Sequence, residues 1–258
     1  MSQPPLQKLP HVNDPECQKV NPFASDKRDK TQQVRQMFDN IAPRYDLMNM
    51  LMTMGIFKLW RRKLVDTVSR VSHADILDIA TGTGDLALIM AEEFPGANIT
   101  GLDLSEQMIK EGKEKALKRG LADRIDMVVG DSLNLPFPDE SFDCVTVAYG
   151  VRNFEDLLRG YTEMHRVLRP DGTLCVLELS TPTGTVTGPL YNLYAGHVIP
   201  AMGRIFAGDS GAYDYLHRSI AAVPQGEQML SIIRNAGFSR ASYLAMTFGA
   251  CTLYAARK

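Results

Sequence analysis

The stretch Asp75-Ile-Leu-Asp-Ile-Ala-Thr-Gly-Thr-Gly-Asp-Leu-Ala87 joins an apolar run, two glycines one residue apart and the start of a helical pattern. A second apolar run, Ile99 to Asp103, follows about twenty residues later and ends in a single carboxylate. This order of strand, glycine turn, helix and strand-end acid is typical of a nucleoside-binding crevice at the edge of a parallel sheet. The stretch therefore predicts an α/β fold that binds a nucleoside near Asp103.

Two classes of cofactor use such a crevice. The glycines and Ala87 satisfy the Gly-x-Gly-x-x-Ala pattern of nicotinamide nucleotides, and Asp103 stands where an acid binds ribose hydroxyls. An acid at Asp85, where the helix begins, opposes a pyrophosphate at that helix end. S-adenosylmethionine (SAM) instead carries an ammonium and a sulfonium, which carboxylates at Asp78 and Asp85 would attract. The acids favour SAM, and a nicotinamide-dependent oxidoreductase is the enzymatic alternative.

Each of these acids also has a purely structural interpretation. Asp85 and Asp103 could cap helices, and Asp78 could be a solvated residue at the end of a strand. Three incidental acids around one glycine turn would be a coincidence. We therefore expect the acids to belong to a SAM site.

The composition is that of an ordinary soluble enzyme. The 258 residues are 45% hydrophobic and 22% charged, which fits one large domain or a domain with an appendage. A net charge of −2 without a basic stripe argues against a nucleic-acid partner. Four cysteines without a close pair predict neither a metal site nor a disulfide framework, and they suit the cytoplasm. No apolar run has the length of a membrane-spanning helix.

The pattern along the chain predicts strands that alternate with helices. We interpret residues 1–28 as a flexible lead-in and 29–73 as a helical lid. Strands are expected at 75–80, 98–103, 125–130, 142–148, 173–180, 239–246 and 250–257. Helices are expected at 85–94, 105–119, 155–168 and 225–235.

This alternation predicts a Rossmann-like, seven-stranded sheet of the class I SAM methyltransferase type, with its last strand antiparallel, over residues 74–258. Residues 181–224 interrupt it with a segment rich in Gly, Pro, Tyr and Met, in which helices are expected at 189–206 and 210–222. The insertion returns over the carboxyl edge of the strands, where ligands bind in such sheets. We interpret it, with the N-terminal helices, as a substrate lid.

Several segments resemble motifs of one family. Tyr45-Asp-Leu-Met-Asn49, followed by Trp60, resembles the N-terminal signature of the quinone-biosynthesis C-methyltransferases, the demethylmenaquinone and ubiquinone-precursor enzymes. Tyr149-Gly-Val-Arg-Asn153 resembles their aromatic-Gly-x-Arg-Asn motif, and the stretch from Arg166 to Ser180 resembles their second signature. The resemblance extends from about Val34 to Lys258.

The resemblance implies cofactor contacts at particular positions. Carried over by position, these are Thr83, Asp103, Asp131 and Ser132, while Ala148 stands where the family often has a serine that can contact the cofactor. Asp131 would meet the adenine amino group, unless it is only a strand-end acid. With the residues argued above, the expected cofactor site comprises Asp78, Gly82, Thr83, Gly84, Asp85, Asp103, Asp131, Ser132 and Ala148.

The resemblance also implies methyl transfer from SAM to a ring carbon of a prenylated quinol. We favour demethylmenaquinol, a naphthoquinol; a benzoquinol, or both substrates, is the alternative. The ring carbon becomes nucleophilic when a neighbouring phenol ionises, and an ordinary phenol has a pKa of about 10. Arg152 is expected to hold the phenolate or an activated water, since arginine stays protonated. Asn153 would orient the quinol oxygen, and Tyr45 would close the pocket.

Each catalytic assignment has an alternative. Arg152 could form a surface salt bridge with Glu155 or Asp156, and Tyr45 could serve packing alone. His197 is a second candidate base, because histidine titrates near neutral pH, but a histidine in an apolar helix is more often structural.

The isoprenoid tail of a quinol needs an apolar environment. An expected tunnel in the insertion consists of Leu190, Tyr191, Tyr194, Met202 and Phe206, which could equally be helix core. The basic residues Lys58, Arg61 and Arg62 favour peripheral contact with the cytoplasmic face of a membrane. A homodimer is a further expectation. A non-catalytic scaffold and a methyltransferase of another small molecule are the other interpretations.

Overall fold

The computed structural model of the chain describes residues 16–23, 25–185, 187–193 and 211–258. Its centre is a seven-stranded sheet in the order β3-β2-β1-β4-β5-β7-β6. The strands are β1 (Asp75–Ile79), β2 (Asn98–Asp103), β3 (Ile125–Val129), β4 (Phe142–Ala148), β5 (Leu168–Leu179), β6 (Ser239–Met246) and β7 (Cys251–Arg257). Strands β1 to β5 are parallel, and β7 is antiparallel to both β5 and β6. The predicted fold class is therefore confirmed.

Strand β5 differs most from its predicted range. It begins at Leu168, which pairs with Phe142, rather than at residue 173. The pairing of β4 with β5 shifts register between Phe142 and Cys144, and Asp171 has a φ of 62°. The strand therefore begins before this irregularity and continues after it. A prediction based on one uninterrupted apolar run misses the first part.

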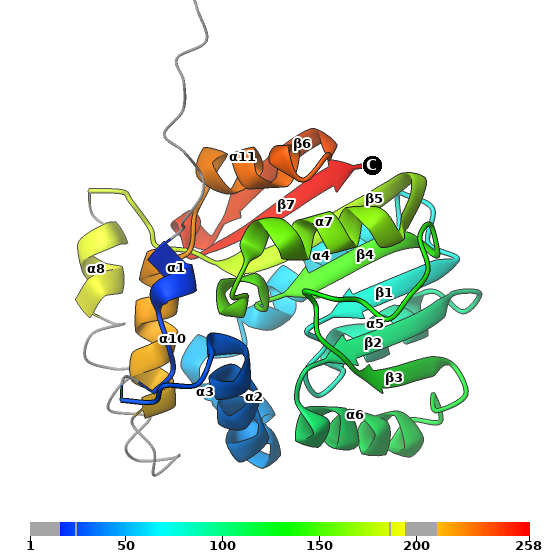
Figure 1. Cartoon of the computed structure of the whole chain (residues 1–258), viewed down its shortest axis with the longest axis horizontal. Coiled ribbons are helices and arrows are strands. Elements are labelled where there is room, and N and C mark those ends of the chain that lie inside the picture. Colours follow the sequence, from blue (N-terminus) through cyan, green and yellow to red (C-terminus); the bar gives the residue numbers. More distant parts are fainter. Residues whose placement is uncertain (1–15, 24, 186, 194–210) are drawn as a thin grey trace, which may run out of the picture.

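Helices cover both faces of the sheet (Figure 1). One face carries α4 (Phe57–Val68), α5 (Asp85–Glu93) and α6 (Glu106–Lys118), and the other carries α7 (Leu157–Val167) and α11 (Glu227–Asn235). Neighbouring residues of each central strand point to opposite faces, so both faces are apolar, as expected for a parallel sheet. Helix α4, which precedes residue 74, packs in the same hydrophobic cluster as α5 and α6.

Polar residues fix where two of these helices begin. The Ser105 hydroxyl accepts a hydrogen bond from the Met108 backbone N–H at 3.1 Å, and the Asp156 carboxylate accepts one from the Arg159 N–H at 2.9 Å. These N-caps place the first helical residues just after Ser105 and Asp156, close to the predicted starts.

The remaining helices gather beside the carboxyl ends of the parallel strands (Figure 1). They are α1 (Glu16–Lys19), α2 (Lys30–Ile41), α3 (Tyr45–Thr53), α8 (Thr187–Leu193) and α10 (Gly211–Ala222), with the 3-10 turn η1 (Ala42–Arg44). Within the expected lead-in, Gln18 Nε2 donates to the Glu155 backbone oxygen at 2.7 Å. Of the insertion, His197, Tyr194, Met202 and Phe206 lie outside the described residues, as do the side chains of Leu190 and Tyr191.

A turn between the last two strands closes this end of the molecule. It is η4 (Thr247–Gly249), in which Thr247 and Phe248 have φ values of 47° and 58°. Trp60 Nε1 on α4 donates to Thr247 Oγ1 at 2.8 Å. The N-terminal helices and the C-terminal hairpin are thereby joined at one edge of the ligand-binding end.

Candidate active site

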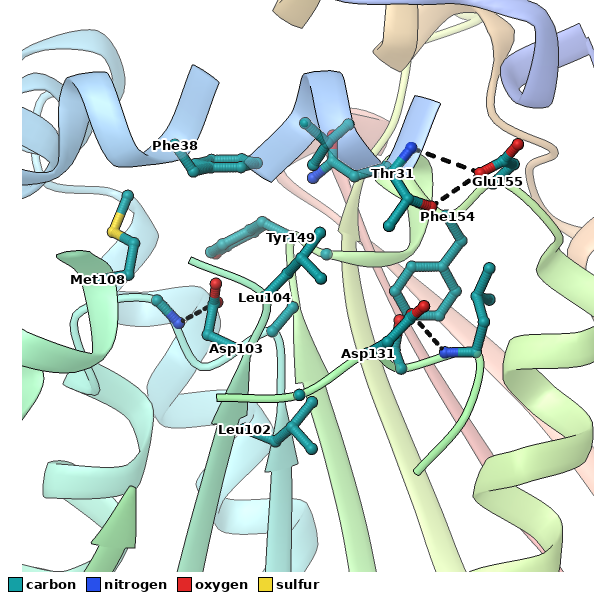
Figure 2. A pocket seen from close by; sticks show the side chains of 18 of the residues that line it. Thr31, Phe38, Leu102, Asp103, Leu104, Met108, Asp131, Tyr149, Phe154 and Glu155 are labelled. Atoms are coloured by element: carbon teal, nitrogen blue, oxygen red, sulfur yellow. Dashed lines mark hydrogen bonds between the residues drawn. The ribbon is translucent and has the colours of Figure 1, made fainter. Parts of the chain in front are cut away.

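A first cavity, of about 670 Å³, lies where β1 to β4 end. The strand ends contribute Ala80, Asp103, Gly130 and Ala148 to its lining, and α2 contributes Phe38 from the opposite side. Figure 2 shows Phe38 on one side of this cavity and the carboxylates of Asp103 and Asp131 on the strand side. This is the crevice that the glycine stretch predicts.

Asp103 is fixed by backbone groups. Its Oδ2 accepts a hydrogen bond from the Gly82 N–H at 2.8 Å, and its Oδ1 accepts one from the Ser105 N–H at 2.9 Å. Burial raises the pKa of Asp103 to about 6. A carboxylate has about four acceptor sites, so these backbone bonds leave acceptor capacity for a ligand hydroxyl. This donor set fits the ribose of a nucleoside.

The two glycines of the loop have different roles. Gly82 lines the cavity with a φ of 58°, and a Cβ there would lie 3.7 Å from Tyr45 Cε1. Gly84 does not line the cavity; a Cβ there would lie 2.4 Å from Met127 Cε. Gly82 therefore lets the backbone turn beside a ligand, whereas Gly84 lets the start of α5 pack closely on β3.

Asp131 and Ser132 line the far end of the cavity, beyond β3. Asp131 Oδ1 accepts a hydrogen bond from the Leu133 N–H at 2.8 Å, which orients the carboxylate. Oδ2 is left to meet an amino group of a ligand. Ala148 also lines the cavity, although its side chain offers no hydrogen bond.

Other predicted cofactor residues lie outside the lining. Asp78 is buried beneath the loop, where its oxygens accept hydrogen bonds from the hydroxyls of Thr81 at 2.6 Å and Thr146 at 2.7 Å. Burial raises the pKa of Asp78 to about 6. Asp85 binds Arg61 and Lys115, each at 2.7 Å. Burial disfavours the charge on Asp85, but these two cations outweigh it and lower the pKa of Asp85 below its usual value.

Lys115 connects the glycine loop to the lid. Its Nζ donates to Thr83 Oγ1 at 2.8 Å and pairs with Asp85 and Asp46. Thr83 Oγ1 in turn donates to Asp46 Oδ1 at 2.7 Å. Thr83, a predicted cofactor residue, therefore binds the helix that carries Tyr45. No motif in the sequence indicates this cluster, because its members come from α3, α5, α6 and the loop.

A second cavity adjoins the first. It is open to solvent, and its space amounts to about 1,940 Å³ with the open mouth included. Its walls come from α2, α3, α4, α10 and η4, and they are mostly Met, Ile, Leu and aromatic side chains. Four residues line both cavities: Phe38, Tyr45, Tyr149 and Asn153. The predicted catalytic residues Tyr45 and Asn153 thus lie where the nucleoside cavity meets the apolar cavity.

Arg152 is held in the wall of the apolar cavity by Glu178. Its Nη1 donates to Glu178 Oε1 at 2.8 Å, and its backbone N–H donates to Oε2 at 3.2 Å. Burial alone would lower the pKa of Arg152, but the facing Glu178 raises it above its usual value. The alternative surface pairing does not form, because Glu155 accepts from Thr31 and Asp156 caps α7.

Glu178 was missed by the sequence reasoning, although a signal exists. It is an acid within the otherwise apolar run from Leu174 to Leu179, and it is 2% exposed. A buried carboxylate requires a partner, so its position in a central strand indicates a buried cation nearby.

Asn153 is oriented by the lid. Tyr215 Oη on α10 donates to Asn153 Oδ1 at 3.1 Å, which leaves the amide nitrogen of Asn153 as a hydrogen-bond donor. The ring of Tyr45 packs edge-on against Phe38, with centroids 6.1 Å apart. The boundary between the cavities is therefore aromatic apart from the amide of Asn153.

Three buried polar atoms stand out among the described residues. Arg61 Nε, Arg152 Nε and Tyr149 Oη have no hydrogen-bond partner by ordinary distance limits, and Tyr149 has only the weakly accepting thiol of Cys251 beside it. All three residues line the apolar cavity. Buried polar groups are normally paired, so these atoms fit ligand oxygens in an otherwise apolar space.

The sheet order and the position of the nucleoside cavity are those of the SAM-dependent methyltransferase fold. The crystal structure of the cyclase SpnF has the same fold, with a TM-score of 0.65 at 20% identity over 88% of this chain and 96% of that chain. Phosphoethanolamine N-methyltransferase 2 from Haemonchus contortus, solved with S-adenosyl-L-methionine, has a TM-score of 0.58 at 18% identity over 86% of this chain and 60% of that chain.

The chain belongs to the ubiE/COQ5 methyltransferase family, whose pattern matches residues 26–258. It is 43% identical to the demethylmenaquinone methyltransferase of Bacteroides fragilis over 93% of this chain and 98% of that protein. It is 42% identical to the demethylmenaquinone methyltransferase of Deinococcus radiodurans over 92% of this chain and 97% of that protein. It is also 41% identical to the ubiquinone/menaquinone biosynthesis C-methyltransferase UbiE of Geotalea uraniireducens, over 89% of this chain and 98% of that protein.

Among the described residues, no group of three or more His, Cys, Asp or Glu side chains could hold a metal ion. Within the same residues, no helix combines the length and the apolar character needed to cross a membrane.

Proposed function

We propose that the protein transfers the methyl group of SAM to a ring carbon of a prenylated quinol, with demethylmenaquinol as its substrate. One observation carries the proposal: the nucleoside cavity meets an apolar cavity of about 1,940 Å³ at Tyr45, Tyr149 and Asn153. Such a cavity suits a naphthoquinol with an apolar tail. The names of the Bacteroides and Deinococcus relatives support demethylmenaquinol, and that of the Geotalea relative keeps a benzoquinol open.

The reaction needs a nucleophilic ring carbon. An ordinary phenol with a pKa of about 10 is ionised in about one molecule per thousand at pH 7, a deficit of roughly 4 kcal/mol. SAM, when bound, supplies an electrophilic methyl group on its sulfonium. The residues at the boundary must therefore stabilise the phenolate and keep the ring in line with that methyl group.

Arg152 is the residue we assign to the phenolate. It is buried and charged, and its Nε lacks a partner, whereas its Nη1 is held by Glu178. A fixed, buried cation stabilises developing negative charge more strongly than it would in water. The amide of Asn153 would donate to a quinol oxygen, and the rings of Tyr45 and Phe38 would exclude water. His197 stays a prediction.

The test is methyl transfer from labelled SAM to chemically reduced demethylmenaquinone, with a benzoquinol acceptor in parallel. Label in the menaquinone product alone supports the proposal and fixes the ring class, and label in both products indicates a dual-substrate enzyme. If neither acceptor is labelled although calorimetry detects SAM binding, the quinol proposal fails and another acceptor or the scaffold interpretation replaces it.

We also propose that the mouth of the apolar cavity contacts a membrane. Met54 and Phe248 line this cavity yet are 77% and 82% exposed, and both have positive φ values. The segment 42–65 around Met54 contains five basic residues and one acid, in a chain of net charge −2. Arg61, however, is buried against Asp85, so it does not contribute to a basic surface.

Sedimentation with anionic vesicles tests this contact. The protein should sediment at low salt, and the double variant Met54→Ser/Phe248→Ser should stay in the supernatant. If the unmodified protein also stays in the supernatant, the membrane proposal is wrong. Light scattering without vesicles checks the expected homodimer.

A further inference from the structure

The nucleoside cavity lacks a partner for one part of SAM. The cofactor ends in an amino-acid tail that carries an α-carboxylate as well as an ammonium. No described residue that lines the nucleoside cavity has a positive charge, whereas Asp103, Asp131 and Glu155 are acids. These acids would repel the carboxylate, and a nearby cation would offset that repulsion. Among the described residues, such a cation comes from outside the lining of the first cavity.

Two cations line the adjoining cavity within the described part of the chain, Arg61 and Arg152. They pair with different acids. Arg152 belongs to the turn after β4 and pairs with Glu178. Arg61 pairs with Asp85, the first residue of the helix that follows the glycine loop. Of these two cations, Arg61 is therefore the one on the side of the nucleotide loop; Lys115 also contacts that loop but lines neither cavity.

Arg61 is buried and held in a fixed orientation, unlike an exposed surface charge. The residue is 7% exposed, and its Nη1 donates to Asp85 Oδ2 at 2.7 Å. Its guanidinium carbon lies 4.6 Å from the centre of the Phe57 ring, which fixes the plane of the group. Its Nε is buried without a partner. An oriented guanidinium with an unpaired Nε–H fits a carboxylate.

We propose that Arg61 binds the α-carboxylate of SAM. Asp85 then acts as a positioning residue, because it holds the guanidinium in place instead of contacting the ammonium of SAM. The buried Asp78 lies within electrostatic range of Arg61 and provides negative charge for the ammonium side of the tail. The proposal adds one contact to the SAM site, and it does not depend on which quinol accepts the methyl group.

The test compares two ligands that differ only in this carboxylate. Calorimetry would measure the binding of S-adenosylhomocysteine and of its decarboxylated analogue, which keeps the ammonium. Arg61→Met should lower the affinity for S-adenosylhomocysteine by about 10- to 100-fold, as expected when a hydrogen bond between charged groups is lost. The affinity for the decarboxylated analogue should change far less. An equal loss for both ligands, or no loss for either, would overturn the proposal.

Two further variants keep the test decisive. Arg62→Met removes the next residue, an exposed arginine that pairs with Asp66 and Glu93, and it should leave both affinities unchanged. Arg61→Lys keeps a positive charge beside Asp85 and should lose less affinity for S-adenosylhomocysteine than Arg61→Met does. The ratio of the two ligand affinities separates carboxylate binding from a general loss of folded protein, because misfolding lowers both. A ratio unchanged in both Arg61 variants overturns the proposal.

Discussion

The two cavities are built by different means. The nucleoside cavity is lined largely by residues at the ends of four neighbouring strands, and backbone N–H groups fix its central carboxylate, Asp103. The apolar cavity is lined by helices and a turn that are far apart in the chain. Its polar groups are held by side-chain pairs such as Arg152 with Glu178. One cavity thus follows from the sheet, and the other depends on individual contacts between helices.

This difference predicts separable defects. Variants of the nucleoside cavity should weaken cofactor binding, whereas variants of the apolar cavity should slow methyl transfer to the quinol. The boundary residues belong to both cavities, so variants there should affect both steps.

The largest effect is expected at Arg152. Arg152→Ala should lower kcat by about 100- to 1,000-fold, as the loss of a fixed donor to developing negative charge does elsewhere, with SAM affinity nearly unchanged. The same change leaves Glu178 buried and unpaired, at a cost of about 3–5 kcal/mol in stability. The double variant Arg152→Ala/Glu178→Gln removes that unpaired charge, so melting should recover while turnover does not. If SAM binding is lost together with turnover in the double variant, Arg152 is structural.

A smaller and different defect is expected at Asp103. Asp103→Asn should lower the affinity for S-adenosylhomocysteine and for its decarboxylated analogue equally, by about 10- to 100-fold, because hydrogen bonds to a charged acceptor contribute about 1.5–3 kcal/mol each. Calorimetry measures both affinities. Asp126→Asn, an exposed position on β3, is the matched control. A loss confined to the ligand with the carboxylate would contradict a ribose role.

The pH dependence of ligand binding also tests the role of the Asp103 carboxylate. Burial raises the pKa of Asp103 to about 6, so the affinity for S-adenosylhomocysteine should fall about tenfold from pH 7 to pH 5 as the carboxylate takes up a proton. In Asp103→Asn, the affinity for S-adenosylhomocysteine should depend less on pH.

The stability of the fold responds to pH in the opposite direction. Because burial raises the pKa of Asp78 and of Asp103 to about 6 in the folded protein, above the ordinary aspartate value of about 3.9, both favour the fold most at low pH, and this contribution is lost as the pH rises to about 6.

The smallest effect is expected at Lys115, which joins the two regions. Its ion pairs are partly exposed, and such pairs contribute about 0.2–1 kcal/mol each, so Lys115→Met should reduce kcat/KM for the quinol by about two- to fivefold. The reason is that α3, which carries Tyr45, is less firmly held on the glycine loop. Lys118→Met, on the same helix but 76% exposed, should have no effect. Steady-state kinetics measure kcat/KM for the quinol in both variants. Equal values would show that Lys115 has no role in the reaction.

The sequence predicts the sheet well because its signals are local. Strands β1 to β4 are short apolar runs closely followed by Gly or ending in Asp, and Asp103 stands at the end of such a run. Residues whose roles depend on contacts between distant elements are harder to predict, as Lys115 and Glu178 show. Arg61 was grouped with surface residues, although Phe57, Arg61 and Leu64 have the spacing of one buried helix face. The helical period around Arg61 was therefore a usable signal.

The hydrogen bond between Trp60 and Thr247 has a practical consequence. Trp60 is the one tryptophan of the chain, it is 7% exposed, and it lines the apolar cavity. Its indole joins a helix near the start of the chain to the turn that precedes the last strand. The intrinsic emission of the protein therefore reports on one wall of the apolar cavity, and occupancy of that cavity can be followed without an attached dye.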